Sequence, residues 1–437
     1  MQVAEVKIWG RVVGTVTWDA EKGYASFEYN RGFRELGWEL APLKMPVARG
    51  RDTFSFRELR RKCYSVHETF KGLPGLFADA LPDALPDAYG NRLIQMWLAQ
   101  QGRAVGSVNP VEMLCFMGTR GMGALEFAPA VFSEKKCAFS LEIDSLVAFA
   151  QKLLSQREAF STRFKKGEKQ AFLEILKSGT SAGGARPKAV IAWNEKSGEA
   201  KPGHTTAPKG FDHWLIKLDG VSDVPKRRSC GYGRVEMAYY LMARACGIEM
   251  MPSRLLEENG RAHFMTRRFD REGAKAKHHV QTFCALKHFD YQQVGNYSYE
   301  DLFQCMRELQ LTKADAEQMF RRMVFNVFAH NCNDHTKKFA FLLKEEGRWQ
   351  LAPAYDLYHN YRPGSPWLSL HALSINGKRS NIARRDLLSV SQMIGCKKAP
   401  EIIDAIADTV HRWKEFADQV QVDRPLRDEI EKSLLHK

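Results

Sequence analysis

Polar residues suited to acid–base and metal chemistry gather in one stretch in the last third of the chain. An apolar helical run at 319–329 leads into the polar loop Asn331-Cys332-Asn333-Asp334-His335-Thr336-Lys337-Lys338. Residues 339–343 are typical of a strand, Gly347 predicts a turn, and Asp356 follows a second strand at 349–351. A polar loop followed by a strand hairpin, with an Asp just beyond it, is a frame suited to phosphoryl transfer.

The spacing of these residues matches the frame on which protein kinases transfer phosphate. That frame has a loop Asp-x-x-x-x-Asn, in which the Asp is the base and the Asn binds metal, and a later Asp that holds Mg²⁺. Here the three positions fall on Asn333, Lys338 and Asp356. An amide accepts no proton at neutral pH, and an ammonium competes with a metal ion. Asp334 is the alternative base, although adjacent loop residues seldom point the same way.

The composition is that of an ordinary folded protein with a basic surface. The 437 residues, 44% hydrophobic and 27% charged, are enough for two or three domains. We expect no membrane contact and a cytoplasmic location, because a spanning helix needs roughly 18 apolar residues and the N-terminus lacks signal-peptide features. Nine cysteines without a C-x-x-C pair indicate reduced thiols and no zinc site. The net charge of +14 fits a solvated surface or contact with nucleic acid or an acidic partner.

Two glycine-rich loops precede the polar stretch. We interpret residues 117–123 as a tight inter-domain turn in preference to a phosphate site. The second loop, Ser181-Ala182-Gly183-Gly184-Ala185-Arg186-Pro187-Lys188, leads into a strand. Its glycines let backbone N–H groups approach phosphate oxygens, and its basic residues add charge. The loop is also compatible with a plain hairpin turn.

A lysine lies inside the apolar strand predicted at 211–218. Burying Lys217 is costly unless a charged group pairs with it. Protein kinases use such a lysine to hold nucleotide phosphates and pair it with a helix glutamate. Glu236 stands near the start of the helix predicted at 234–246. The alternative is a strand-edge lysine that reaches solvent.

The order of these elements predicts an α+β protein with a two-lobed, protein-kinase-like fold. Alternating apolar residues at 3–29 predict antiparallel strands. We place a small N-terminal β domain at 1–110, a β-rich lobe with the glycine-rich loop at 111–268, and a mainly helical C-terminal lobe with the catalytic and metal loops at 269–437. The helical patterns of the last lobe run through 281–329 and 399–437.

The chain resembles the HipA family, the serine/threonine kinase toxins of bacterial toxin–antitoxin pairs. The resemblance covers essentially the whole chain and rests on the motifs at 121–127, 181–188, 352–356 and 376–379. It implies ATP and Mg²⁺ as cofactors. It also implies a HipB-like helix-turn-helix antitoxin, operator DNA bound through that complex, and a protein substrate of the translation machinery, with aminoacyl-tRNA synthetases as the substrate class.

The resemblance also implies roles for single residues. Residues 181–188 would cover the nucleotide, and Ser181 matches the serine whose autophosphorylation silences family members. Lys217 would hold the phosphates beside Glu236, and Asp356 would bind Mg²⁺. Arg267, Arg268 and Phe269 would form the hinge that contacts the adenine, although the family often has an acidic residue in place of Arg267. Tyr355 would also belong to the nucleotide site. The catalytic loop would comprise Asn333, Asp334, His335, Lys337 and Lys338. A basic turn that touches operator DNA would comprise Gly377, Lys378 and Arg379.

Two hypotheses follow. In the first, the chain is a HipA-like kinase that transfers the γ-phosphate of ATP to a serine of a translation protein. In the second, it is a pseudokinase that binds nucleotide and chiefly pairs with an antitoxin on DNA. Asn333 and Lys338 separate the two hypotheses, because loss of a catalytic base removes about 10²–10⁴-fold of rate.

Overall fold

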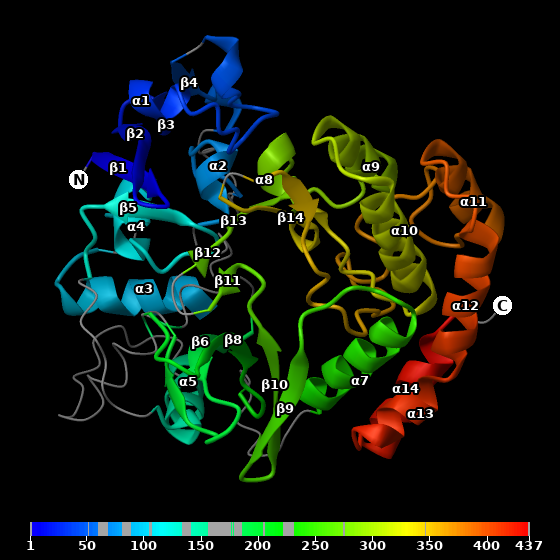
Figure 1. The fold of residues 1–437 in the computed structure, drawn as a ribbon. Helices are drawn as coiled ribbons and strands as arrows, with labels where there is room; N and C mark the ends of the chain where they lie inside the picture. The colour runs from blue at the N-terminus through cyan, green and yellow to red at the C-terminus, as the bar shows by residue number, and fades with distance from the viewer. Residues whose placement is uncertain are drawn as a thin grey trace.

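The computed structural model describes residues 2–50, 52–59, 69–80, 89–104, 107–132, 141–155, 176, 178, 186–203, 206–221, 231–273, 276–345 and 347–435. These residues form an α+β structure with two five-stranded antiparallel sheets toward the N-terminus and mostly helices toward the C-terminus. Figure 1 shows the N-terminal strands and the C-terminal helices α11 to α14 on opposite sides of the molecule. Residues 80–87, a tandem repeat of the four residues Ala-Leu-Pro-Asp, lie almost wholly outside the described residues.

The N-terminal sheet has the strand order β4-β3-β2-β1-β5. Its strands are β1 Val3–Ile8, β2 Arg11–Asp19, β3 Tyr24–Tyr29, β4 Thr53–Ser55 and β5 Leu125–Ala128. The predicted meander at 3–29 is confirmed. β5 pairs antiparallel with β1, so the first sheet extends beyond the boundary expected at 110. Helices α1 Arg31–Arg34, α2 Gly75–Ala78, α3 Tyr89–Gln100 and α4 Pro110–Met117 belong to the same part of the chain.

The second sheet carries the predicted strand lysine and has the order β7-β6-β8-β10-β9. Its strands are β6 Lys188–Trp193, β7 Ala200–Pro202, β8 Asp212–Lys217, β9 Ser253–Glu258 and β10 Arg261–Arg267, and its helices are α5 Ile143–Ser155 and α7 Tyr232–Ala245. A Cβ on Gly233 would meet the carbonyl oxygen of Ala262 at 2.0 Å, so this glycine lets α7 lie close to β10. On its other side, α7 packs Tyr239 against Trp413 in an edge contact, with ring centroids 5.4 Å apart. The helix is therefore held by both lobes.

The C-terminal lobe combines a small sheet with helices. Strands β13 His279–Thr282, β14 Ala340–Leu343 and β15 Trp349–Leu351 form the sheet, and β11 Arg271–Glu272 pairs with β12 Ala276–Lys277. The helices are α8 Phe283–Lys287, α9 Tyr299–Glu308, α10 Lys313–Phe328, α11 Arg384–Met393, α12 Ala399–His411, α13 Trp413–Gln419 and α14 Arg424–Ser433. The helical expectation at 281–282 was wrong, because these residues pair with β14. Among the described helices, none is long and apolar enough to cross a membrane.

The first glycine-rich loop joins the N-terminal sheet to the strands that follow β10. The carboxylate of Asp270 accepts a hydrogen bond from the N–H of Gly123 at 2.8 Å. The guanidinium of Arg271 donates to the carbonyl oxygens of Gly121 at 3.0 Å and Gly123 at 2.9 Å. The backbone groups of this loop thus form hydrogen bonds with protein side chains, in agreement with its interpretation as an inter-domain turn.

Two histidines connect the N-terminal part of the chain to the C-terminal lobe. His279 Nε2 donates to the carbonyl oxygen of Leu40 at 3.1 Å, and His288 Nε2 accepts from the N–H of Gly75 at 3.0 Å. Gly75 is required here, since a Cβ would lie 2.1 Å from the carbonyl oxygen of Ala285. Burial lowers the pKa of His279 to about 4 and that of His288 to about 3.

These histidines should make the protein less stable in mild acid. Both pKa values are below the unfolded value of about 6.5, so the stability is complete above that pH and falls as the pH drops toward 4. Each histidine should lower the free energy of unfolding by about 1.4 kcal/mol per pH unit in this window. Urea unfolding from about pH 7.5 down to about pH 4 spans this window. It should show a shallower pH dependence for His288→Gln, whose amide oxygen keeps an acceptor for Gly75.

The control for this pH dependence is His411→Gln, because His411 is exposed at the end of α12. That variant should keep the slope of the unmodified chain. An unchanged slope in His288→Gln would show that the contact with Gly75 does not link protonation to stability.

Candidate nucleotide site

The centre of the site is an ion pair between β8 and α7. Lys217 lies in β8 opposite Lys188 of β6 and Phe264 of β10, and residues opposite one another in a sheet share a face. Glu236 is in the second turn of α7, and one of its carboxylate oxygens lies 2.5 Å from Lys217 Nζ. The two side chains are only 14% and 5% exposed, so the lysine is paired inside the protein and does not extend into solvent from a strand edge. The predicted partnership of Lys217 and Glu236 is confirmed.

The β14–β15 hairpin brings Asp356 to the same ion pair. Phe341 lies opposite Leu351, and Ala352 N–H donates to the carbonyl oxygen of Ala340 at 3.0 Å. The residues just before β14 and just after β15 therefore meet at one end of the hairpin. Asp356, with φ at 57° in the left-handed region that Asp tolerates, turns its carboxylate toward this end.

Asp356 contacts two lysines, one through each carboxylate oxygen. Lys217 contacts Oδ1, and Lys338 contacts Oδ2 from the short helix η3 Thr336–Lys338. Burial by itself would raise the pKa of Asp356, but Lys217, Lys338 and Lys188 hold it well below its usual range. Burial likewise opposes the charge on Lys217, yet Asp356 and Glu236 raise its pKa above the ordinary value. Asp356 and Lys217 are thus charged at neutral pH.

The residues present do not fit Mg²⁺. This ion takes six oxygen ligands in near-octahedral geometry, whereas both oxygens of Asp356 already face ammonium groups. Among the described residues, no group of three or more His, Cys, Asp or Glu side chains is placed to hold a metal ion. Where Asp356 was expected to bind Mg²⁺, the structure has the ammonium group of Lys338.

Asp334 is turned away from this cluster and holds the loop together. It is fully buried, and its carboxylate accepts from the Tyr299 hydroxyl at 2.8 Å, the His371 imidazole at 2.9 Å and the N–H of Ala372 at 2.7 Å. A side chain in this environment does not meet a substrate hydroxyl, and geometry is the first requirement for a general base. This burial speaks against the alternative base. Its neighbour Asn333 is only half-buried.

His335 and Lys337 both lie near the aromatic ring of Tyr291. The His335 imidazole lies 5.1 Å from the ring of Tyr291, and Lys337 Nζ lies 4.7 Å from the centroid of the same ring. The Lys337 carbonyl oxygen also accepts from the Tyr355 hydroxyl at 2.7 Å. The structure therefore separates these two residues of the predicted catalytic loop from Lys338, which contacts Asp356.

The predicted hinge residues and Tyr355 divide into two groups. Phe269 and Tyr355 lie together, with ring centroids 5.7 Å apart, against a small apolar cluster of Val280, Ala340, Leu342 and Ala352. Arg267 pairs with Asp212 at 3.0 Å, and Arg268 is buried against Asp270 at 2.6 Å. The Arg268 side chain is thus part of the inter-domain joint, and only Phe269 and Tyr355 present rings suited to an adenine.

The structure describes only the end of the loop at 181–188 that was predicted to cover the nucleotide. Ser181 to Ala185 lie outside the described residues. Arg186 stacks its guanidinium 4.3 Å from the ring centroid of Tyr232 and 4.9 Å from that of Tyr358, and Lys217 Nζ lies 5.6 Å from the Tyr358 ring. Sequence reasoning missed Tyr358, for which the only local signal is its position two residues after Asp356.

Comparisons with known proteins identify the family of the chain. A model of the HipA-like C-terminal domain matches residues 180–415, and a model of the HipA N-terminal domain matches residues 4–128. The chain belongs to the HipA family. Its fold matches that of HipA in the HipA–HipB–operator DNA complex of Shewanella oneidensis MR-1, with a TM-score of 0.63, 14% identity, and coverage of 98% of this chain and 99% of that one.

A second relative lies among curated proteins. The chain is 24% identical over 202 residues to a Sinorhizobium fredii protein provisionally named kinase Y4mE. The match spans 42% of this chain and 47% of that protein, about half the length of each. Together with the HipA domains, this relative supports membership of a kinase family.

The basic turn of this HipA-family chain makes contacts within the protein. Lys378 Nζ lies 2.8 Å from a carboxylate oxygen of buried Asp386, and Arg379 Nε donates to the carbonyl oxygen of His371 at 2.6 Å. Gly377 has φ of 74°, in the left-handed region, and is exposed at the tip. Both basic side chains are partly exposed, so the turn is anchored in the lobe and still reaches the surface.

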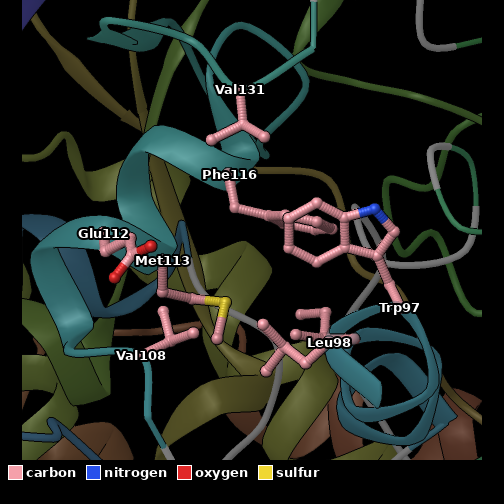
Figure 2. Close-up of a pocket in the computed structure, with 8 residues that line it drawn as sticks. Trp97, Leu98, Val108, Glu112, Met113, Phe116 and Val131 are labelled. Carbon is pink, nitrogen blue, oxygen red and sulfur yellow. The ribbon is translucent and has the colours of Figure 1, made fainter. Parts of the chain in front are cut away.

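A small apolar hollow with a cavity volume of about 10 Å³ lies in the N-terminal part of the HipA-family chain (Figure 2). Trp97, Leu98 and Met113 line it, and the carboxylate of Glu112 at its edge pairs with Arg103 at 2.6 Å. None of the residues that line this hollow belongs to the Lys217–Asp356 cluster. The hollow is therefore separate from that cluster.

Proposed function

We propose that this HipA-family chain is a pseudokinase, which retains the kinase fold and acts by binding. The observation that carries the proposal is the contact of Lys338 with Asp356, because it puts an ammonium where a kinase places a metal ion. The base position is the second support. Asn333 has no basic lone pair, and the burial of Asp334 removes its nearest substitute.

The active HipA-like kinase is the second candidate. The Lys217–Glu236 pair at 2.5 Å favours it, because active kinases need such a pair to hold nucleotide phosphates. In that case the substrate would be a serine of a translation protein, with an aminoacyl-tRNA synthetase as the substrate class. A kinase of this kind would need ATP with Mg²⁺ and a proton acceptor at the base position, which the amide of Asn333 does not provide.

The test is phosphoryl transfer from labelled ATP with Mg²⁺, followed as ATP hydrolysis and self-labelling so that no external substrate is needed. We expect the unmodified chain to match its Asp356→Asn variant, which lacks the charged centre of the site. Transfer clearly above that variant would contradict the pseudokinase proposal and support the enzyme.

The binding function that we propose is to pair with a HipB-like helix-turn-helix antitoxin in a cytoplasmic complex on operator DNA. The fold match with HipA of a HipA–HipB–operator DNA complex and the net charge of +14 support this proposal. Lys378 and Arg379 are the residues that we expect to lie nearest the phosphate backbone.

Replacing Lys378 and Arg379 by alanine should weaken DNA binding by the antitoxin complex and make it less salt-dependent. Each lost phosphate contact should reduce the slope of log K against log salt by about 0.9. Titrations at several salt concentrations measure this slope, and Arg412→Ala/Lys414→Ala, at another exposed site, is the control. Melting curves must show that loss of the Lys378–Asp386 pair leaves the lobe folded. The same slope in the folded double variant would remove the basic turn from the DNA interface.

A further inference from the structure

Among the residues that the structure describes, those of the Lys217–Asp356 cluster carry more positive than negative charge. Three cations, Lys217, Lys338 and Arg186, face two carboxylates, Glu236 and Asp356. Lys188 adds positive charge close to Asp356. The side chains of Lys217, Lys338 and Asp356 are 14%, 19% and 24% exposed. Excess positive charge in a partly buried place is costly without an anion.

The type and arrangement of the cationic groups indicate which anion would fit. Ammonium groups act as compact point charges with several N–H donors and no acceptor, so they bind phosphate oxygens well. Lys217 and Lys338 meet at one carboxylate and therefore lie close enough to contact neighbouring phosphates of one chain. The rings of Phe269 and Tyr355, on the β13–β14 side, offer an apolar surface for a base.

We propose that this cleft binds a nucleoside triphosphate without a divalent cation, with the ammonium of Lys338 in the place of the metal ion. The inference rests on the proposed function, since it concerns the same site. Mg²⁺ would have to displace Lys338 from Asp356 before that carboxylate could bind it. A metal-free triphosphate also carries more negative charge than its Mg²⁺ complex, which suits a cleft with excess cations.

Metal dependence should consequently be the reverse of that in an active kinase. Calorimetric titration of the full chain with ATP should show binding in EDTA that is at least as tight as binding in excess Mg²⁺. Lys338→Asn should weaken binding in EDTA by about 10- to 100-fold, as expected for loss of a hydrogen bond to a charged group. The same variant should bind more tightly once Mg²⁺ is added.

Three controls make the result specific. Lys344→Asn removes a lysine at the far end of β14 that is half exposed and should leave ATP binding unchanged. Adenosine, which lacks phosphates, should bind the unmodified chain and Lys338→Asn equally. Lys338→Gln, which keeps most of the side-chain length without its charge, replaces Lys338→Asn if melting curves show that the latter does not fold.

The proposal would be overturned if the folded, unmodified chain bound ATP only with Mg²⁺, or bound no ATP in either buffer. It would also be overturned if Lys338→Asn and Lys344→Asn had the same affinity in EDTA. These outcomes are independent of the phosphoryl-transfer assay. Transfer by the unmodified chain would contradict the pseudokinase function alone, whereas failure of ATP to bind in EDTA would contradict only the metal-free site.

Discussion

Changing Asn333 to Asp and Lys338 to Asn together should raise phosphoryl transfer by about 10²–10⁴-fold, the usual contribution of a positioned general base. The new carboxylate at 333 accepts a proton that an amide cannot. The new amide at 338 removes an ammonium from Asp356 Oδ2 and gives the site a neutral oxygen ligand. Hydrolysis and self-labelling with labelled ATP and Mg²⁺ measure the gain.

The single variants show whether the two changes act as a unit. We expect Asn333→Asp and Lys338→Asn alone to stay near the unmodified chain, because residues that act together have strongly non-additive effects. Adding Asp356→Asn to the double variant should abolish the gain. If the double variant were no faster than the unmodified chain, then positions 333 and 338 are not what limits transfer.

Asp334→Ala should lower the free energy of unfolding by about 3–5 kcal/mol, the cost of breaking a buried, hydrogen-bonded charged group. The change leaves the Tyr299 hydroxyl, the His371 imidazole and the N–H of Ala372 without their buried acceptor. Hydrogen exchange of amides in the C-terminal lobe, supported by melting curves, measures the loss locally.

Two comparisons separate a structural role from a catalytic one. Asp334→Asn keeps an acceptor for Ala372 and should cost less stability than Asp334→Ala. Asp418→Ala, which removes a carboxylate that is 56% exposed beside Arg427, should change stability by no more than about 0.5 kcal/mol. If Asp334→Ala left stability unchanged and reduced phosphoryl transfer, Asp334 would be the base and the pseudokinase proposal would fail.

The local pattern of the sequence was sufficient for the elements that carry the site. The alternation at 3–29, the apolar strand around Lys217 and the hairpin before Asp356 all depend on neighbouring residues, and each is present in the structure. The pairing of Lys217 with Glu236 was predictable for a related reason. A buried lysine requires a charged partner, and the next helix supplied one near its start.

The family, the two-lobed fold and the chemical identity of the residues at 333 and 338 were also determined by the sequence alone. The residue type at each position of the kinase frame decides whether its side chain can accept a proton or bind a metal ion. Packing does not change this. The helical expectation failed at 281–282 because the pairing of β13 with β14 is a contact between distant segments.

Only the tertiary structure decided where the side chains of the polar loop point. Asp334 finds its partners at Tyr299, His371 and Ala372, all more than thirty residues away. Lys338 contacts one carboxylate oxygen of Asp356 and Lys217 contacts the other, because the two lobes meet at this residue. Sequence spacing fixes which residues are neighbours along the chain. Burial and hydrogen bonding between distant segments then decide which neighbour faces the cleft and which holds the core together.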